Sequence, residues 1–318
     1  MRSSAQCEWK GKFSGRGAIR GGCTSKMAES VKAEMSQEEQ DKHDSNYQKL
    51  LALYVALLTK WDSDSTDALF ELCEQRADSI IEIAFEGMGV DYDKALQLLK
   101  NKDDNNLTQH DKDVRDRIVA AVNNLIDFAV CEEYQLYLET AKAIKSGGDI
   151  LLDPNSDEYV ELISSCKKYN DTYASVEDSD VKYAMGIAAW WIGLGNRDYL
   201  MYMTQNDSRV RPWHMELQGY IERRDDFPSW MIPPIEWHCR CFLEVVEPGM
   251  MGKGKNIKKV MGKTMTVTKP SQIDGVFSES VAKCGRIFGP SHGYFSVEEK
   301  DKDMLDGFVS AIKQKYYG

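Results

Sequence analysis

Two clusters of polar residues in the second half of the chain contain the side chains from which catalytic, metal-binding and anion-binding sites are built. The first cluster, residues 207–214, reads DSRVRPWH, and the second, residues 237–241, reads WHCRC. Histidine and cysteine transfer protons, act as nucleophiles or bind metals, and arginine and aspartate form charge-assisted hydrogen bonds. Gly219 and the pair Pro233-Pro234 lie between the clusters. We expect the fold to bring the two clusters together as the rigid centre of a small domain.

The second cluster contains two cysteines, Cys239 and Cys241, separated by one residue. A strand over residues 239–246 is predicted here, and its side chains alternate between two faces. Both thiols then share a face with Leu243 and Val245. Buried free cysteine behaves as a small apolar group. The pattern therefore favours packing of both thiols in the core, with redox or disulfide chemistry as one alternative.

A metal site is the other alternative for this cysteine pair. Structural zinc usually uses four ligands, with paired cysteines separated by two to four residues. Here one residue separates the pair, and His214 and His238 are the candidates for further ligands. This alternative would make the protein a zinc-stabilised adaptor. The favoured interpretation requires neither a metal nor any other cofactor.

Arg240 lies on the opposite face of this predicted strand from the two thiols. Its planar guanidinium, with five N–H donors, is suited to a carboxylate, and Asp207 in the first cluster is the candidate partner. We expect the two to form a structural clamp between the clusters. The alternative is an anion or phosphate site made by Arg209, Arg211 and Arg240.

His214 could act as a general base only with a nucleophile and an orienting acid, for which Asp207 is the nearest candidate. The chain contains no G-x-S-x-G, H-E-x-x-H, P-loop or G-x-G-x-x-G motif, so we predict no catalytic residue and assign His214 to the scaffold. Gly219 is expected to supply a backbone angle that larger residues resist. Pro233 and Pro234 are expected to stiffen the approach to the strand.

The order D-x-R-V-R-x-x-H, then a glycine, a proline pair and C-R-C, resembles the minor head, or head morphogenesis, proteins of tailed bacteriophages, the phage Mu F-like family. The resemblance covers roughly residues 183–246, and His238 stands where the family commonly has asparagine. The residues that carry it are Asp207, Arg209, Arg211, His214, Gly219, Pro233, Cys239, Arg240 and Cys241.

This resemblance implies a non-enzymatic structural component of the virion. Such a protein would associate with the portal vertex inside the capsid, with the portal protein and capsid or scaffold components as partners, and would assist assembly or DNA packaging and ejection. The alternative is an enzyme, a metal-dependent hydrolase or nuclease, because related phage proteins sometimes carry a fused toxin or transferase domain. About seventy residues follow Val246, too few for a separate catalytic domain of ordinary size.

Composition limits the partners. The chain has 318 residues, a net charge of −11 and 42% apolar residues, values typical of a soluble protein that nucleic acid repels. Its longest apolar run, residues 184–194, is too short to span a bilayer, so no membrane association is predicted. The eight cysteines lack a disulfide pattern. Weak local contact with packaged DNA is assigned to five lysines: Lys253, Lys255, Lys258, Lys259 and Lys263.

The surrounding pattern predicts an α+β protein in three parts. Residues 1–26 form a disordered basic leader, with Met27 favoured as the natural start over a basic tail that contacts DNA. Residues 27–150 form a helical hairpin or bundle, because apolar residues recur at helical spacing. Residues 151–318 form a small α+β domain with a short antiparallel sheet, a lysine-rich loop at 249–269 and a C-terminal helix capped at Ser296. Individual helices are predicted from Ser65 and over residues 92–100, 109–144, 157–169 and 175–194, and the first strand over 197–204.

Overall fold

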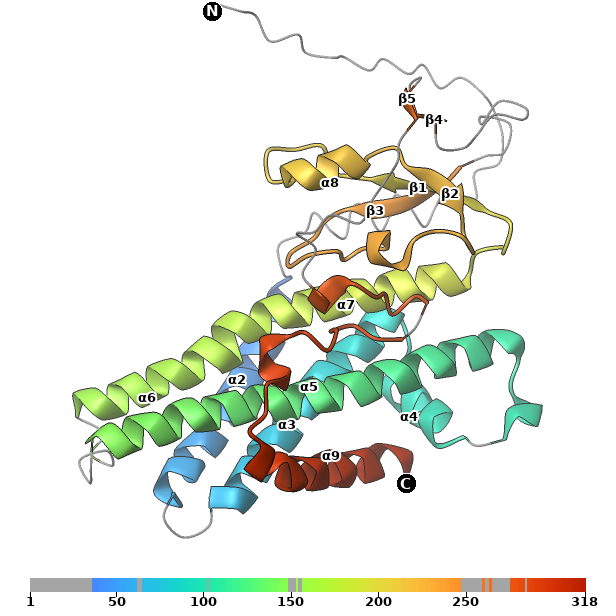
Figure 1. Ribbon diagram of the computed structural model, residues 1–318. Helices are drawn as coiled ribbons and strands as arrows, with labels where there is room; N and C mark the ends of the chain where they lie inside the picture. Colours follow the sequence, from blue (N-terminus) through green and yellow to red (C-terminus); the bar gives the residue numbers. More distant parts are fainter. Residues whose placement is uncertain are drawn as a thin grey trace, which may run out of the picture.

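The computed structural model describes residues 36–61, 65–101, 103–147, 153, 156–246, 259–260, 263–264, 275–283 and 285–318. Long helices dominate the first part of the chain, and a small antiparallel sheet follows them (Figure 1). This arrangement confirms the predicted α+β class. Residues 1–26, Met27 and most of the lysine-rich segment lie outside the described residues. In the described part of the chain, no helix combines the length and the apolar character needed to cross a membrane.

The first helices follow the predicted boundaries closely. Ser36 caps its helix by accepting from the Glu39 amide, and Asp91 caps another by accepting from the amides of Asp93 and Lys94. Such side chains satisfy amide groups that have no partner within a helix. Gly89 follows one helix with a φ of 70°, an angle that glycine adopts without strain. The four helices are α2 (Gln37–Thr59), α3 (Ser65–Met88), α4 (Tyr92–Lys100) and α5 (Gln109–Gly147), with the 3₁₀ turn η1 (Asp104–Asn106) before α5.

The two helices predicted over residues 157–169 and 175–194 are both present, but no break separates them. Helix α6 (Asp157–Lys167) continues through the six-residue π-helical segment η3 (Lys168–Tyr173) into α7 (Ala174–Ile192), so that one rod crosses the molecule (Figure 1). Neither glycine nor proline occurs between Lys167 and Ser175, so nothing interrupts the helical backbone. The wider π turn accommodates the shift between the two helical stripes.

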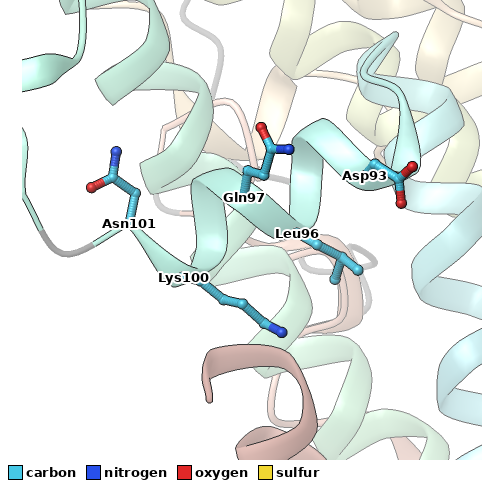
Figure 2. Close-up of a pocket in the computed structure, with 5 residues that line it drawn as sticks. All are labelled: Asp93, Leu96, Gln97, Lys100 and Asn101. Carbon is cyan, nitrogen blue, oxygen red and sulfur yellow. The ribbon is translucent and has the colours of Figure 1, made fainter.

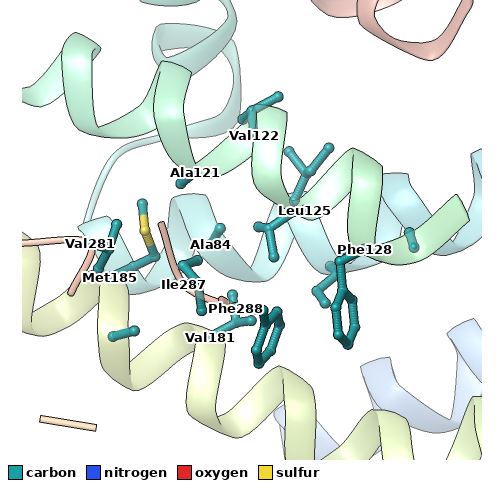
Figure 3. Close-up of a cluster of buried hydrophobic side chains, with 14 of the residues drawn as sticks. Ala84, Ala121, Val122, Leu125, Phe128, Val181, Met185, Val281, Ile287 and Phe288 are labelled. Atoms are coloured by element: carbon teal, nitrogen blue, oxygen red, sulfur yellow. The ribbon is translucent and has the colours of Figure 1, made fainter. Parts of the chain in front are cut away.

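The rod packs closely on the other helices. A Cβ atom at Gly87 in α3 would collide with the carbonyl oxygen of Lys182 in α7, so the absence of a side chain permits this approach. Figure 3 shows apolar side chains from α3, α5, α7 and the C-terminal segment meeting in the core. These side chains include Ala84, Leu125, Val181, Met185, Ile287 and Phe288.

The sheet lies over one end of α7, as seen in Figure 1. Its strands β1 (Tyr199–Met203), β2 (Ile221–Arg223) and β3 (Phe242–Val246) are antiparallel, in the order β2-β1-β3. The last strand was predicted to begin at Cys239 but begins at Phe242. His238 adopts a left-handed backbone with a φ of 55°, and the carbonyls of Arg240 and Cys241 accept from the side chains of Gln205 and Tyr183. These carbonyls therefore bond to side chains, and the strand pairing starts after them.

Short elements connect the sheet to the C-terminus. They are α8 (Pro212–Leu217), η4 (Ser229–Met231), β4 (Lys259–Val260), β5 (Lys263–Thr264), η6 (Gly275–Phe277), η7 (Gly293–Phe295) and η8 (Glu299–Asp301), before helix α9 (Lys302–Tyr317). The predicted cap at Ser296 was wrong, because α9 begins six residues later. The Ser296 carbonyl instead accepts from the Gln135 side chain at 3.0 Å, which holds this segment against α5.

An ionic network lies inside the helical bundle. Arg76 of α3 is 1% exposed. Its Nε donates to Glu132 of α5 at 2.7 Å, and its terminal nitrogens donate to Glu177 and Asp178 of α7 at 2.9 and 2.8 Å. The carboxylates outnumber the guanidinium, so the network holds surplus negative charge that burial makes costly.

Glu133 of α5 adjoins this network and has no ion-pair partner among the described residues. One of its carboxyl oxygens accepts from Asn170 at 3.3 Å, and the other has no hydrogen-bond partner among the described residues. Burial, reinforced by the charge of Glu132, raises the pKa of Glu133 well above its usual range. The protonated carboxyl is therefore the form that the folded protein favours.

Replacing Glu133 with glutamine should stabilise the protein at neutral pH. A carboxyl whose pKa is raised by folding contributes stability below its unfolded pKa of about 4.3, and this contribution is lost as the pH rises. Glutamine does not titrate. The free energy of unfolding of Glu133→Gln should therefore rise relative to that of the wild type between about pH 4 and 7, by about 1 kcal/mol or more at pH 7. Urea denaturation across this range measures the difference, and a constant difference would contradict the assignment.

Candidate functional site

The fold brings the two polar clusters together beside the sheet. The first cluster ends in helix α8, whose first residue is Pro212 and which places His214 on its buried side. Proline suits this position because the first amide of a helix has no acceptor within the helix. The second cluster, residues 237–241, leads directly into β3.

His214 faces both cysteines of the second cluster. Its Nδ1 atom lies 3.3 Å from Sγ of Cys241 and 3.9 Å from Sγ of Cys239. All three residues are at most 3% exposed, and their potential ligand atoms lie within 4.8 Å of one another. Burial raises the pKa of the Cys239 thiol, whereas interaction with that thiol lowers the pKa of Cys241 against the effect of burial.

The other ring nitrogen of His214 contacts a carboxylate that the sequence analysis did not single out. Nε2 lies 3.1 Å from Oε2 of Glu236, and the same oxygen accepts from Trp213 Nε1 at 3.1 Å. Arg211 Nε forms an ion pair with this oxygen, also at 3.1 Å. Arg211 in addition donates to the Trp237 carbonyl at 2.8 Å. The signal for Glu236 was its place between the proline pair and the second cluster.

Asp207 and Arg240 form a bidentate pair across the two clusters. The guanidinium donates to the two carboxylate oxygens at 2.8 and 2.7 Å, and the Arg209 amide donates to one of them at 3.0 Å. The hydrogen bonds from Arg240 lower the pKa of Asp207 to about 2. Arg240 is thus paired with Asp207, and Arg211 with Glu236.

Replacing Asp207 with asparagine should lower stability slightly at pH 7, because the pair is partly exposed and solvent screens it. A carboxylate with a lowered folded pKa contributes stability above its unfolded pKa of about 3.9, and the contribution is lost as the pH falls toward 2. The thermal midpoints of wild type and Asp207→Asn should therefore converge on acidification. Midpoints that differ equally at pH 7 and pH 2 would contradict this role.

His238 lies apart from the sulfurs. Its side chain is exposed, its left-handed backbone redirects the chain, and its amide donates to Asp180 Oδ2 at 3.0 Å. Asp180, in α7, is 2% exposed, and burial raises its pKa. Sequence reasoning missed Asp180, which lies on a helix otherwise described by its apolar residues.

The remaining motif residues shape the backbone. Gly219 has a φ of 81° and donates its amide to the Tyr202 carbonyl at 2.8 Å, a geometry that favours glycine. The Pro233-Pro234 bond is cis, and both prolines are buried. Of the lysines predicted to contact DNA, Lys253, Lys255 and Lys258 lie outside the described residues. Lys259 and Lys263 are described only as backbone, in β4 and β5.

Tyr202 of β1 completes the surroundings of the sulfurs. Its side chain is fully buried, and its hydroxyl has no hydrogen-bond partner in the described part of the chain. Burial raises the pKa of this hydroxyl, and the nearby thiols of Cys239 and Cys241 raise it further. The interaction of this hydroxyl with the Cys241 thiol places Tyr202 beside the sulfurs.

Comparison with known proteins identifies the central part of the chain. Residues 139–244 match the family model described as Phage Mu protein F like protein. This region is phage Mu F-like. The match confirms the resemblance deduced from the two clusters, since residues 207–241 lie inside it. No solved structure shows a significant match to the chain.

A curated relative supports the same assignment. The Mu-like prophage FluMu F protein of Haemophilus influenzae is 42% identical over 67 residues, which are 20% of this chain and 16% of the relative. The alignment thus spans less than a fifth of the relative's length. The Mu F-like region contains the rod of α6 to α7, the sheet as far as Glu244, and the complete group of His214, Glu236, Cys239 and Cys241.

A hollow on the surface lies outside the Mu F-like region. It has a volume of about 550 Å³ and is lined by residues of α4 and its end, as Figure 2 shows: Asp93, Leu96, Gln97, Lys100 and Asn101. None of the motif residues lines it. The polar groups of the Mu F-like region instead contact one another.

Proposed function

We propose that this chain is a minor head protein of a tailed phage, a structural component that acts in head morphogenesis. The observation that carries the proposal is the Mu F-like match over residues 139–244, together with the likeness to a prophage F protein. The family match includes the two polar clusters. The likeness covers part of each protein, so the role of the whole chain is inferred from this shared region.

The contacts that the motif's polar groups make support a structural role over a catalytic one. Arg240 is engaged by Asp207, Arg211 by Glu236, and His214 by Glu236 and the thiols. Groups committed to such internal contacts hold segments of the fold in place, whereas a catalytic group needs access to substrate. We therefore propose a non-enzymatic role.

The proposed location is the capsid interior at the portal vertex, with the portal protein and capsid or scaffold components as partners. The net charge of −11 disfavours extensive DNA binding. Contact with packaged DNA is accordingly confined in this proposal to the lysine-rich segment. Assistance in packaging or ejection would follow from the position of the protein at the portal.

Mass spectrometry of purified virions and empty procapsids tests this proposal. The chain should be present in both particles, at a few copies relative to the portal protein, and tagged full-length chain should retain co-expressed portal protein. A non-structural protein of the same phage serves as the negative control. Absence of the chain from both particles would contradict the proposal.

A thiol enzyme is the second candidate, because Glu236, His214 and Cys241 follow the order of acid, base and nucleophile. Cys241 is 2% exposed, which argues against this use. Alkylation of the native chain with iodoacetamide separates the two roles. Cys239 and Cys241 should react as slowly as the buried Cys73, whereas rapid, selective alkylation of Cys241 would favour the enzyme.

A further inference from the structure

We propose that His214, Cys239 and Cys241 bind one zinc ion, which fastens helix α8 to the segment that leads into β3. The three residues come from two parts of the chain and are all buried. Imidazole and thiolate are the ligands that structural zinc prefers. The proposed ion is structural, and it goes beyond the role in head morphogenesis.

The distances between the donor atoms suit such an ion. With Zn–S and Zn–N distances of about 2.3 and 2.0 Å and tetrahedral angles, nitrogen and sulfur ligands lie about 3.5 Å apart. The observed separations of Nδ1 from the two sulfurs, 3.3 and 3.9 Å, lie on either side of this value. A small convergence of the side chains therefore produces the coordination geometry.

The contact on the far side of His214 is an independent observation. A zinc-binding histidine usually donates its other N–H to a carboxylate, which fixes the tautomer and the ring orientation. Nε2 of His214 lies 3.1 Å from Glu236, so a proton on Nε2 leaves the Nδ1 lone pair directed at the sulfurs. Arg211 and Trp213 hold the carboxylate in this position.

Tyr202 supplies the fourth position in this proposal. Its buried hydroxyl, which lacks a hydrogen-bond partner among the described residues, belongs to the residue paired with Leu243 of β3. Coordination by this oxygen would replace its interaction with the Cys241 thiol. The ion would then join β1, α8 and the start of β3, in a sheet whose strands have only five, three and five residues.

Core packing of the thiols, which the sequence pattern favoured, explains less. It predicts aliphatic neighbours on one strand face, but Cys239 and Cys241 precede β3, and Val245 is 42% exposed. Packing also gives no reason for an imidazole nitrogen to face both sulfurs, or for the carboxylate behind it. The zinc ion accounts for all of these positions.

Metal analysis of the full-length chain, purified under reducing conditions, tests the proposal. About one zinc per chain should remain after gel filtration, and cobalt exchanged into the site should give the thiolate charge-transfer band and tetrahedral spectrum of a sulfur-ligated ion. Wild-type protein without bound zinc or a thiolate–cobalt band, or with a Cys239–Cys241 disulfide under these conditions, would overturn it.

Variants locate the ion. Cys239→Ser, Cys241→Ser and His214→Gln should each lose most of the zinc, whereas Cys166→Ser, at another buried free cysteine, should retain it. Tyr202→Phe should bind zinc more weakly in competition with a chelator, and unchanged affinity would remove Tyr202 from the site. Where a ligand variant fails to fold, the wild-type cobalt spectrum and the fall in its thermal midpoint on chelation decide the question.

Discussion

Replacing Arg76 with methionine is expected to lower the free energy of unfolding by about 3–5 kcal/mol, since it leaves buried carboxylates without their cation. Arg76 is fully enclosed and binds Glu132, Glu177 and Asp178 from two other helices. Methionine fills much of the space but provides no donors. Urea denaturation followed by far-ultraviolet circular dichroism measures the loss.

A compensating variant shows whether charge is the cause. Adding Glu132→Gln and Glu177→Gln to Arg76→Met removes two of the orphaned charges and should recover part of the lost stability. Arg286→Met is the matched control, because Arg286 is 44% exposed and pairs with Glu279 at 3.7 Å; its effect should stay within about 0.5 kcal/mol. If Arg76→Met and Arg286→Met lose equal stability, the buried ionic network is not the source of the loss.

This network illustrates what the sequence could not predict. The helices around it were predicted from the spacing of apolar residues and from the glycine after α3. These signals involve only residues that are close together in the sequence. Arg76 and Glu132 are separated by more than fifty positions, so their pairing depends on how α3 packs against α5. Charged residues on a predicted helix are normally assigned to its solvent-facing side, which is wrong for both residues.

The junction of α6 and α7 was mispredicted for a related reason. The apolar stripe shifts around the helix at residues 168–173. If a regular helix period is assumed, such a shift is interpreted as the end of one helix and the start of another. The π-helical turn absorbs it without ending the helix. Similarly, the assumed alternation of side chains placed the start of β3 at Cys239. The left-handed backbone at His238 and the side-chain donor to the Cys241 carbonyl delay the strand pairing.

The candidate site was partly visible in the sequence. Residue types and spacing pointed to the two clusters, and the expected pairing of Asp207 with Arg240 corresponds to a contact in the structure. Glu236 and Tyr202 were not found, because their contribution depends on the sheet register and on the turn before α8. Local patterns identify reactive residue types, whereas the groups that orient them are set by tertiary packing.

Replacing Phe288 with alanine is the second change with a large expected effect. Phe288 is fully buried and stacks on Phe128 of α5, with ring centroids 4.1 Å apart and an angle of 23° between the rings. Figure 3 shows the two rings side by side at the edge of the helical core. Removing such a ring leaves a cavity, so the variant should lose about 3–5 kcal/mol, measured by urea denaturation.

The loss should be concentrated in the C-terminal segment. Asn124 of α5 accepts from the amides of Ile287 and Phe288 at 2.9 and 2.8 Å and donates to the Phe288 carbonyl at 3.0 Å. These bonds and the stacked ring hold residues 285–296 against α5. Hydrogen exchange in Phe288→Ala should therefore accelerate in this segment before it does in α3.

An exposed substitution provides the control for this experiment. Val160 in α6 is 60% exposed, so Val160→Ala should change stability by no more than about 0.5 kcal/mol and leave hydrogen exchange unaltered. Asn124→Ala should reproduce the local acceleration of Phe288→Ala, because it removes the backbone contacts of the same segment. Uniform acceleration throughout the helices, with no early change at residues 285–296, would show that Phe288 acts on the bundle as a whole and not on the docking of the C-terminal segment.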